Sequence, residues 1–345
     1  MPDLRSPYPY FGGKSRVASE VWARFGDVRN YVEPFFGSGA VLLQRPQPFG
    51  GTETINDLDG FVANFWRAMQ ADPEALTDAC DWPVNENDLH ARHAWLVERK
   101  GAMQARLEGD PDWYDVKTAG WWAWGLCCWI GSEWCSGKGP WRVVESDGVK
   151  VLTKQGNAGR GVNRQLPHLG GAGQGVNRQL REGDDDGGGL LPYFEALASR
   201  LRRVRVCCGD WSRVMGPTPT VKQGLTGVFL DPPYSGESGR DNALYTREDL
   251  SVAHQVRAWC IEHGDDPKLR IALCGYEGEH EALESAGWSC LAWKANGGYA
   301  SQSSNRNGNA NANAKRERIW FSPHCLRVDS ASPPLFDHID SRQPA

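Results

Sequence analysis

The sequence predicts an α/β fold, a Rossmann-like sheet with helices on both faces that is interrupted by an inserted, mostly helical or irregular segment. Three observations predict it. Short apolar runs typical of buried strands alternate with helical patterns toward both ends of the chain. A strand over residues 30–33 leads through a glycine turn into a helix. Between residues 73 and 190 this alternation gives way to Trp-rich and Gly-rich sequence. A sheet domain with an insert is the simplest architecture that fits all three.

The first part of the sheet is expected before the insert. Residues 30–33 are rich in strand-forming side chains, and residues 35–39 form the glycine turn. A second strand is expected over residues 53–57. An amphipathic helix follows over residues 61–69, because its large apolar side chains recur at helical spacing.

The second part of the sheet is expected after the insert. A proline near its start favours a helix over residues 192–203. The apolar run 226–230 is typical of a buried strand, and it ends at Asp231. The other expected elements are a helix over 247–263 and strands over 204–208, 269–274, 288–293 and 318–321.

The insert is expected to hold two helices, over residues 87–107 and 113–130, and then a Gly-rich stretch with few strands. The hexapeptide of residues 161–166 recurs at 175–180, and two copies are too few for a solenoid. Four tryptophans follow helical spacing, so we expect them to form the core of the insert rather than a surface for stacking nucleic-acid bases. They are Trp121, Trp122, Trp124 and Trp129.

The composition is that of an ordinary globular protein. The chain has 345 residues, of which 40% are hydrophobic and 23% charged, enough for one large domain or two moderate ones. No apolar run approaches the roughly 20 residues that span a bilayer, and the N-terminus lacks the apolar stretch of a signal peptide. We therefore expect a cytoplasmic protein that does not associate with membranes. The ten Cys include no C-x-x-C pair, which favours buried free thiols over disulfides or structural zinc.

The net charge of −5 does not by itself indicate a nucleic-acid partner. Its distribution is more informative, because residues 138–181 carry eight basic side chains and two acidic ones. A basic strip of this kind is able to bind a polyanion. A solvated loop that happens to contain several arginines is the alternative, and charge alone does not separate the two.

A candidate ligand site lies at the glycine turn. A turn between a strand and a helix lets a ligand approach the backbone at Gly37 and Gly39. Asp57 ends the second strand twenty positions after Gly37, where a carboxylate can accept from both hydroxyls of a ribose. Asp210 follows a later strand and is placed to accept from an adenine amine. The alternative is a common turn with unrelated acids nearby.

Two further motifs carry candidate chemistry. Gly12-Gly13-Lys14 lacks the spacing of a phosphate-binding P-loop, but a lysine on a glycine turn is able to hold a carboxylate. Asp231-Pro232-Pro233-Tyr234 directly follows a buried strand. Its prolines fix the backbone and remove two donors, which leaves carbonyl groups free to accept. A rigid turn without chemistry is the structural alternative.

Together these residues resemble the Dam-type family of DNA adenine-N6 methyltransferases, especially those carried by phages. The resemblance covers roughly residues 7–70 and 190–325. Tyr245 and the helix after it lie where the family has further cofactor-pocket residues. The matching motifs are the N-terminal cofactor motif Tyr10–Lys14, motif I at Glu33–Gly39, the ribose-binding Asn56-Asp57, a G-D-F-like stretch at Cys208–Trp211 and the catalytic tetrapeptide Asp231–Tyr234.

The resemblance implies a methyltransferase sheet, S-adenosylmethionine as methyl donor, S-adenosylhomocysteine as product and no required metal. A carboxylate and a carbonyl of the tetrapeptide would accept from both hydrogens of adenine N6 and favour the pyramidal amine that attacks the sulfonium methyl. The base must first leave the duplex stack, and Tyr234 would then stack on it. The expected catalytic residues are Asp231, Pro232, Pro233 and Tyr234. The expected cofactor-binding residues are Tyr10, Lys14, Glu33, Phe35, Gly37, Gly39, Asp57, Asp210 and Asp231.

The family places its target-recognition domain in the interval that the insert occupies here. We therefore expect residues 1–72 and 191–328 to form the catalytic domain, residues 73–190 a target-recognition insert and residues 329–345 a flexible tail. Asn, Gln and Arg side chains make bidentate contacts with adenine and guanine edges. The repeated hexapeptide thus supplies the candidate contacts to double-stranded DNA: Asn163, Arg164, Gln165, Asn177, Arg178 and Gln179. Two structural turns with exposed polar groups are an equal alternative.

The sequence leaves other functions open. A methyltransferase that acts on cytosine N4, or on adenine in RNA, is a first alternative, because those enzymes share similar tetrapeptides. A DNA-binding protein with a relic cofactor fold is a second alternative, which the intact Lys14, Asp57, Asp231 and Tyr234 disfavour. A nucleotide-dependent oxidoreductase is disfavoured because Leu42 occupies the third glycine position of G-x-G-x-x-G. A bacterial or phage-infected cell is the expected setting, and restriction protection and regulation both remain possible roles.

Overall fold

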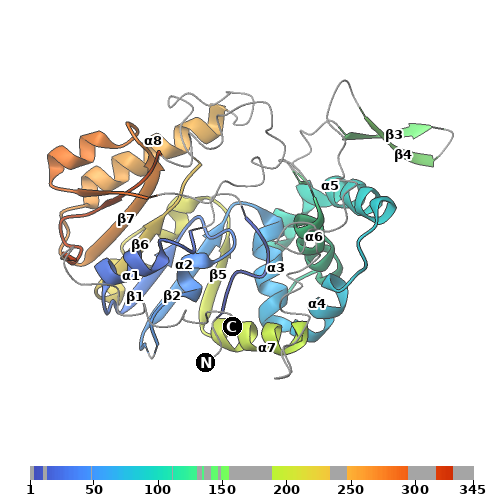
Figure 1. Cartoon of the computed structure of the whole chain (residues 1–345), viewed down its shortest axis with the longest axis horizontal. Coiled ribbons are helices and arrows are strands. Elements are labelled where there is room, and N and C mark those ends of the chain that lie inside the picture. The colour runs from blue at the N-terminus through green and yellow to red at the C-terminus, as the bar shows by residue number, and fades with distance from the viewer. Residues whose placement is uncertain are drawn as a thin grey trace, which may run out of the picture.

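The structure is a computed structural model that describes residues 4–10, 14–47, 49–110, 112–129, 134–135, 141–146, 149–154, 189–233, 247–293 and 316–328. Its main element is a mixed sheet of seven strands, which confirms the predicted α/β fold (Figure 1). Five neighbouring strands run parallel, the sixth pairs antiparallel with the fifth, and the last pairs antiparallel with the sixth. The order across the sheet is β5 (Val204–Cys208), β2 (Thr52–Asp57), β1 (Asn30–Glu33), β6 (Thr226–Leu230), β7 (Leu269–Tyr276), β9 (Glu317–Phe321) and β8 (Ser289–Ala292).

Helices cover both faces of the sheet, because alternate strand residues point to opposite sides. Tyr31 and Phe229 belong to one hydrophobic cluster, which also contains side chains of the helices α1 (Ala18–Phe25), α3 (Gly60–Ala71) and α7 (Leu190–Leu201). Their strand neighbours Val32, Val228 and Leu230 belong to a second cluster with α8 (Arg247–His263). Each central strand is therefore buried on both sides, as a parallel sheet requires.

The described part of the insert is mainly helical. It contains the helices α4 (Pro73–Cys80), α5 (Glu86–Gly109) and α6 (Val116–Cys128) and the antiparallel hairpin of β3 (Trp141–Ser146) and β4 (Val149–Lys154). The three helices lie beside the β5 edge of the sheet, and the hairpin projects beyond them (Figure 1). The sequence analysis did not predict α1, α4 or the hairpin. The hairpin had a local signal, because Asp147-Gly148 between its strands is a pair typical of tight turns.

The Trp-rich helix of the insert forms core, as its spacing predicted. Trp122, Trp124 and Trp129 are buried, and Trp121 is partly buried and packs against the same core. Trp122 packs against Tyr8 with ring centroids 5.0 Å apart, so the core of the insert continues into the core of the sheet. The guanidinium of the buried Arg92 lies among three indole rings, those of Trp82, Trp121 and Trp124, at 4.9, 4.8 and 4.3 Å from the ring centroids.

All ten cysteines are free thiols, most of them buried. None of the helices in the described ranges combines the length and the apolar character needed to cross a bilayer.

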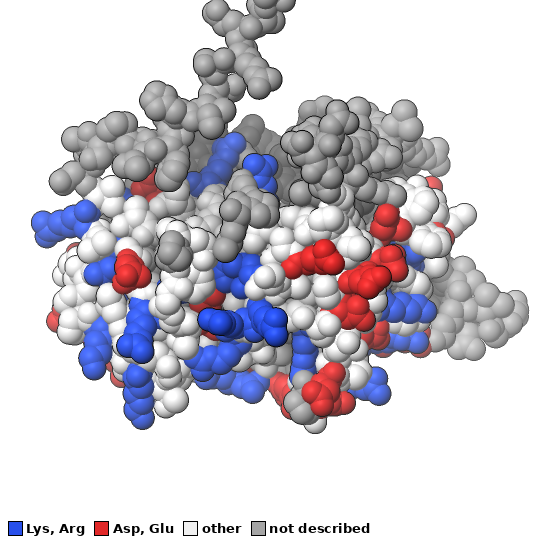
Figure 2. All heavy atoms as spheres, turned by 90° about the horizontal axis from the view of Figure 1, so that it is seen from below, with Lys and Arg blue, Asp and Glu red and all other residues white. Residues whose placement is uncertain are grey.

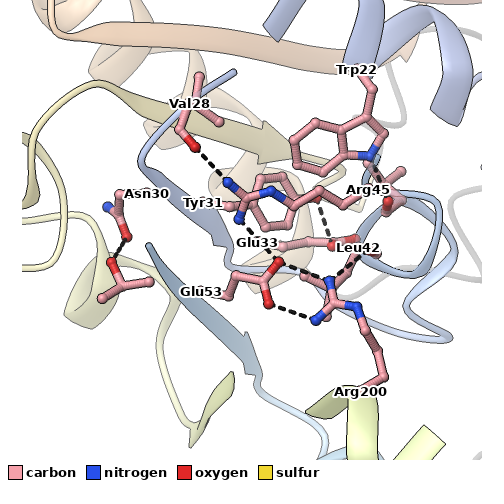
Figure 3. A network of polar contacts seen from close by, with 11 residues as sticks. Trp22, Val28, Asn30, Tyr31, Glu33, Leu42, Arg45, Glu53 and Arg200 are labelled. Carbon is pink, nitrogen blue, oxygen red and sulfur yellow. Dashed lines mark hydrogen bonds and ion pairs between the residues drawn. The ribbon is translucent and has the colours of Figure 1, made fainter. Parts of the chain in front are cut away.

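A buried ion network joins the two parts of the sheet domain (Figure 3). Glu53 of β2 is 3% exposed. Its carboxylate accepts from Arg45 Nη1 at 3.0 Å and from both terminal nitrogens of Arg200, at 2.7 and 2.8 Å. The two arginines also donate to backbone carbonyls, Arg45 to Val28 at 2.5 Å and Arg200 to Leu42 at 3.2 Å. Because Arg200 lies on α7, this network fastens a helix that follows the insert to a strand that precedes it.

We expect Glu53→Ala to destabilise the fold by about 3–5 kcal/mol, because it leaves two buried guanidinium groups without their carboxylate. The measurement is the free energy of unfolding from urea titration. Glu20→Gln is the matched control. It removes the exposed Glu20–Arg24 pair, whose N···O distance is 2.6 Å, and should cost about 0–1 kcal/mol. Equal effects of the two changes would contradict the assigned importance of the network.

Candidate cofactor and catalytic site

The predicted site residues come together at one edge of the sheet. The strands β1, β2, β5 and β6 are parallel neighbours, so their carboxyl ends meet at the same edge. Glu33 ends β1, Asp57 ends β2, Asp210 follows β5 and Asp231 follows β6. Ligands of open α/β sheets bind at this edge. The separate motifs of the sequence therefore belong to one region of the molecule.

The glycine turn is held in place by its carbonyl and amide groups. The carbonyl of Gly37 accepts from the Tyr8 hydroxyl and from Trp66 Nε1, each at 2.9 Å. The Gly37 N–H donates to Asp57 Oδ2 at 2.9 Å. Gly37 has φ +50° and Gly39 φ +72°, and a Cβ at Gly37 would lie 2.5 Å from the Tyr10 ring. Glycine is thus required both by backbone conformation and by the close aromatic ring.

Asp57 is already bonded on both oxygens and still has room to accept. Its Oδ1 accepts from the Asp59 N–H at 2.9 Å, while Oδ2 accepts from Gly37. Each carboxylate oxygen has two acceptor positions, and the backbone N–H of Leu58 is a third donor to this carboxylate, so the three donors leave one of the four positions open. Burial raises the pKa of Asp57 to about 7, although the backbone donors act in the opposite direction.

Asp210 lies at the end of a turn that the neighbouring strands fix. Asn56, buried on β2, donates through Nδ2 to the carbonyls of Gly209 at 2.9 Å and Pro34 at 3.1 Å. It therefore ties together the ends of three strands. Asp210 itself is exposed, and its Oδ1 accepts from the backbone N–H and the hydroxyl of Ser212. The sequence analysis grouped Asn56 with the ribose motif but gave it no role of its own.

Lys14 and Asp231 form an ion pair. The Lys14 ammonium lies 3.0 Å from Asp231 Oδ2, and the lysine side chain is 4% exposed. Burial lowers the pKa of Lys14. The nearby Asp231, Cys274 and Glu317 raise it by more than burial lowers it, so the pKa of Lys14 lies above its ordinary value. Lys14 is thus a buried cation. The sequence predicted that Lys14 contacts the cofactor. In the structure Lys14 pairs with Asp231, the carboxylate predicted to be catalytic.

The other predicted residues of this edge differ in exposure. Glu33 is buried and accepts from the Tyr31 hydroxyl at 2.8 Å. Burial raises the pKa of Glu33 well above its ordinary value, although the Tyr31 bond lowers it. Tyr10 is partly exposed, and the Phe35 ring stacks near that of Trp211 at 6.2 Å. Pro232 is buried, and Pro233 is half-buried.

Several predicted residues lie outside the described residues. They are the Tyr234 of the tetrapeptide, Tyr245 and the six candidate DNA contacts Asn163, Arg164, Gln165, Asn177, Arg178 and Gln179.

The raised pKa of Asp57 gives a test based on pH. A carboxyl with a higher pKa in the folded chain binds its proton more tightly when folded. The stability of the fold therefore falls as pH rises from an ordinary carboxyl pKa of about 4 to about 7. We expect the unfolding free energy of the wild type to fall relative to that of Asp57→Asn between about pH 4 and about pH 7. Urea titrations at each pH measure it, and a difference independent of pH would contradict the assignment.

A known protein family matches part of the chain. Residues 10–99 match the model of the D12 class N6 adenine-specific DNA methyltransferase family. The matched range contains Lys14, the glycine turn and Asp57, and it ends within α5. No curated protein matches the chain. Over residues 10–99 the chain is therefore similar to the D12 class N6 adenine-specific DNA methyltransferases, and within this range the resemblance drawn from the sequence is confirmed.

Proposed function

We propose that this protein transfers a methyl group from S-adenosylmethionine to N6 of an adenine that has been turned out of a DNA duplex. The observation that carries the proposal is the Lys14–Asp231 pair at 3.0 Å. Lys14 comes from the range that matches the family, whereas Asp231 lies outside it and begins the tetrapeptide. The pair thus connects the matched part of the chain to the expected catalytic residue.

The residues at the edge of the sheet fit S-adenosylmethionine. The acceptor position that remains open on Asp57 suits a ribose hydroxyl, and the exposed Asp210 suits the adenine amine. Leu58, which is 61% exposed directly after Asp57, offers an apolar surface for the adenine ring. The glycine turn brings the backbone within reach of the same ligand. When bound, the cofactor supplies a methyl group activated by a sulfonium.

Asp231 and the prolines after it are proposed to bind the amine of the target base. Adenine N6 is a weak nucleophile because its lone pair is delocalised into the ring. A carboxylate oxygen of Asp231 and a carbonyl of the proline pair would accept its two hydrogens and favour a pyramidal nitrogen. Lys14 donates to Asp231 and so fixes the direction of that carboxylate. Tyr234 is proposed to stack on the extruded base.

The insert is proposed to recognise the DNA. Residues 1–72 and 191–328 would form the catalytic domain, with residues 73–190 between them as the recognition part and the tail 329–345 after them. The repeated Asn-Arg-Gln triplets, residues 163–165 and 177–179, remain the candidate base contacts.

We expect Asp231→Ala to lower methyl transfer to DNA by roughly 10²-fold or more, because the amine loses an oriented acceptor. Radiolabelled methyl transfer into unmethylated genomic DNA, followed by nucleoside analysis, measures both the rate and the product. DNA binding should be largely retained. Methyl label in cytosine, or in RNA alone, would contradict adenine in DNA as the substrate. Full activity of Asp231→Ala would exclude Asp231 from the mechanism.

Cofactor choice is tested by thermal unfolding. S-adenosylmethionine at about 100 times its Kd should stabilise the wild type by about 2.7 kcal/mol. The same concentration of NAD should leave the melting temperature unchanged. Asp57→Ala removes the proposed ribose acceptor and should weaken the shift, whereas Asp78→Asn, an exposed change on α4, should not. A shift with NAD and none with S-adenosylmethionine would favour the oxidoreductase alternative.

A further inference from the structure

A basic surface lies at the edge of the sheet opposite Asp231. Figure 2 shows Lys and Arg side chains gathered over the middle of the face that is seen from below. Six exposed cations lie just before, or early in, the parallel strands. We call this set the basic edge, and it consists of Arg29, Arg202, Arg203, Arg205, Lys222 and Lys268.

The charges of the basic edge are not neutralised within the part of the chain that the structure describes. None of the six side chains makes an ion pair or a side-chain hydrogen bond there. Three acidic residues lie nearby, Asp27, Asp265 and Asp266, and Asp265 is 3.3 Å from His324. A protein of net charge −5 therefore concentrates unpaired positive charge on one edge. Such a local field attracts polyanions.

A hollow of about 410 Å³ opens within this edge, between the starts of β2, β1 and β6. Its lining includes Arg29 and Lys222. Gly51 and Gly224 also line it, with φ +144° and +107°. A Cβ at Gly51 would lie 1.7 Å from the Arg29 carbonyl, so a side chain is excluded there. The hollow thus places two cations beside glycines that carry no side chain, so a phosphate group is able to approach both charges closely.

We propose that the basic edge binds the phosphate backbone of a second DNA duplex. The proposal rests on the proposed function for the identity of the polyanion. Five parallel strands spaced by about 4.8 Å make an edge of roughly 19 Å. One DNA strand advances by about 3.4 Å per nucleotide, so the edge is long enough to follow about five nucleotides. The cations would contact phosphates and not base edges, so binding at the basic edge is expected to be independent of the DNA sequence.

The duplex at the basic edge is a different segment from the one at Asp231. The two ends of β6 are separated by five residues, or roughly 17 Å at about 3.3 Å per residue. A single duplex that contacted both the basic edge and Asp231 would have to bend back on itself over roughly 17 Å. The persistence length of DNA is about 50 nm, so such a turn is strongly disfavoured. The protein therefore joins two DNA segments when both edges are occupied.

A bridging experiment tests the inference. A long duplex from unmethylated genomic DNA is fixed to beads and incubated with the protein, and a fluorescent 30-bp duplex of dG and dC alone is added. The wild type should retain the labelled duplex. Arg29→Gln with Lys222→Gln should reduce retention at least tenfold and lower the salt slope of labelled-duplex binding by about 1.8, or about 0.9 for each lost phosphate contact. Methyl transfer to the fixed DNA should stay within about twofold, because both positions lie away from Asp231.

The control separates a local effect from a change in net charge. Glu74→Gln and Asp78→Asn, both exposed on α4, are added to the double variant and restore the net charge to −5. Retention should remain low in this fourfold variant, and recovery would overturn the inference. Retention that survives the double variant would overturn it as well. The two proposals are separable. If the wild type bridges DNA through Arg29 and Lys222 but transfers no methyl group, DNA binding by the basic edge is supported and the proposed function is contradicted.

Discussion

The ion pairs of the Glu53 carboxylate hold together the two parts of the sheet domain that the insert separates in sequence. The carboxylate joins Arg200 to a strand 147 positions earlier in the chain, with the whole insert between them. Arg45 approaches the same carboxylate from the short helix region after the glycine turn. Buried ion pairs give little net stability over apolar packing, but an unpaired member is very costly. The network therefore acts mainly on the specificity of the fold, because Arg45, Glu53 and Arg200 are all paired only when α7 packs in its native position.

The same network connects packing to the ligand-binding edge. Arg200 also donates to the carbonyl of Leu42, at the end of the helix that starts after Gly39. At the other end of that segment, Tyr8, Trp66 and Asp57 hold Gly37 by hydrogen bonds of 2.9 Å. The glycine turn is thus fixed from both sides before any ligand arrives. A preorganised turn of this kind loses little conformational entropy on binding.

Local patterns predicted the seven strands of the sheet to within two residues at each end, because most are short runs of strand-forming side chains, and β1 and β6 end at Pro34 and Asp231. They predicted α7 less well. It begins at Leu190, earlier than its proline suggested, because Pro192 falls in the first turn, where backbone N–H groups have no helical partner. The Lys14–Asp231 pair and the Glu53 network had no local signal. Each joins residues that are far apart in sequence, and their contact is set by strand order, which a single sequence does not reveal.

The distribution of tryptophan has a spectroscopic consequence. Nine of the sixteen indoles lie between residues 73 and 190, several of them packed around Arg92 or beside His93. Intrinsic fluorescence of the whole protein is thus weighted toward the helical insert, while circular dichroism reports on sheet and helices together. An emission change without a matching dichroism change would therefore favour a local event in the insert over a change in the secondary structure of the sheet.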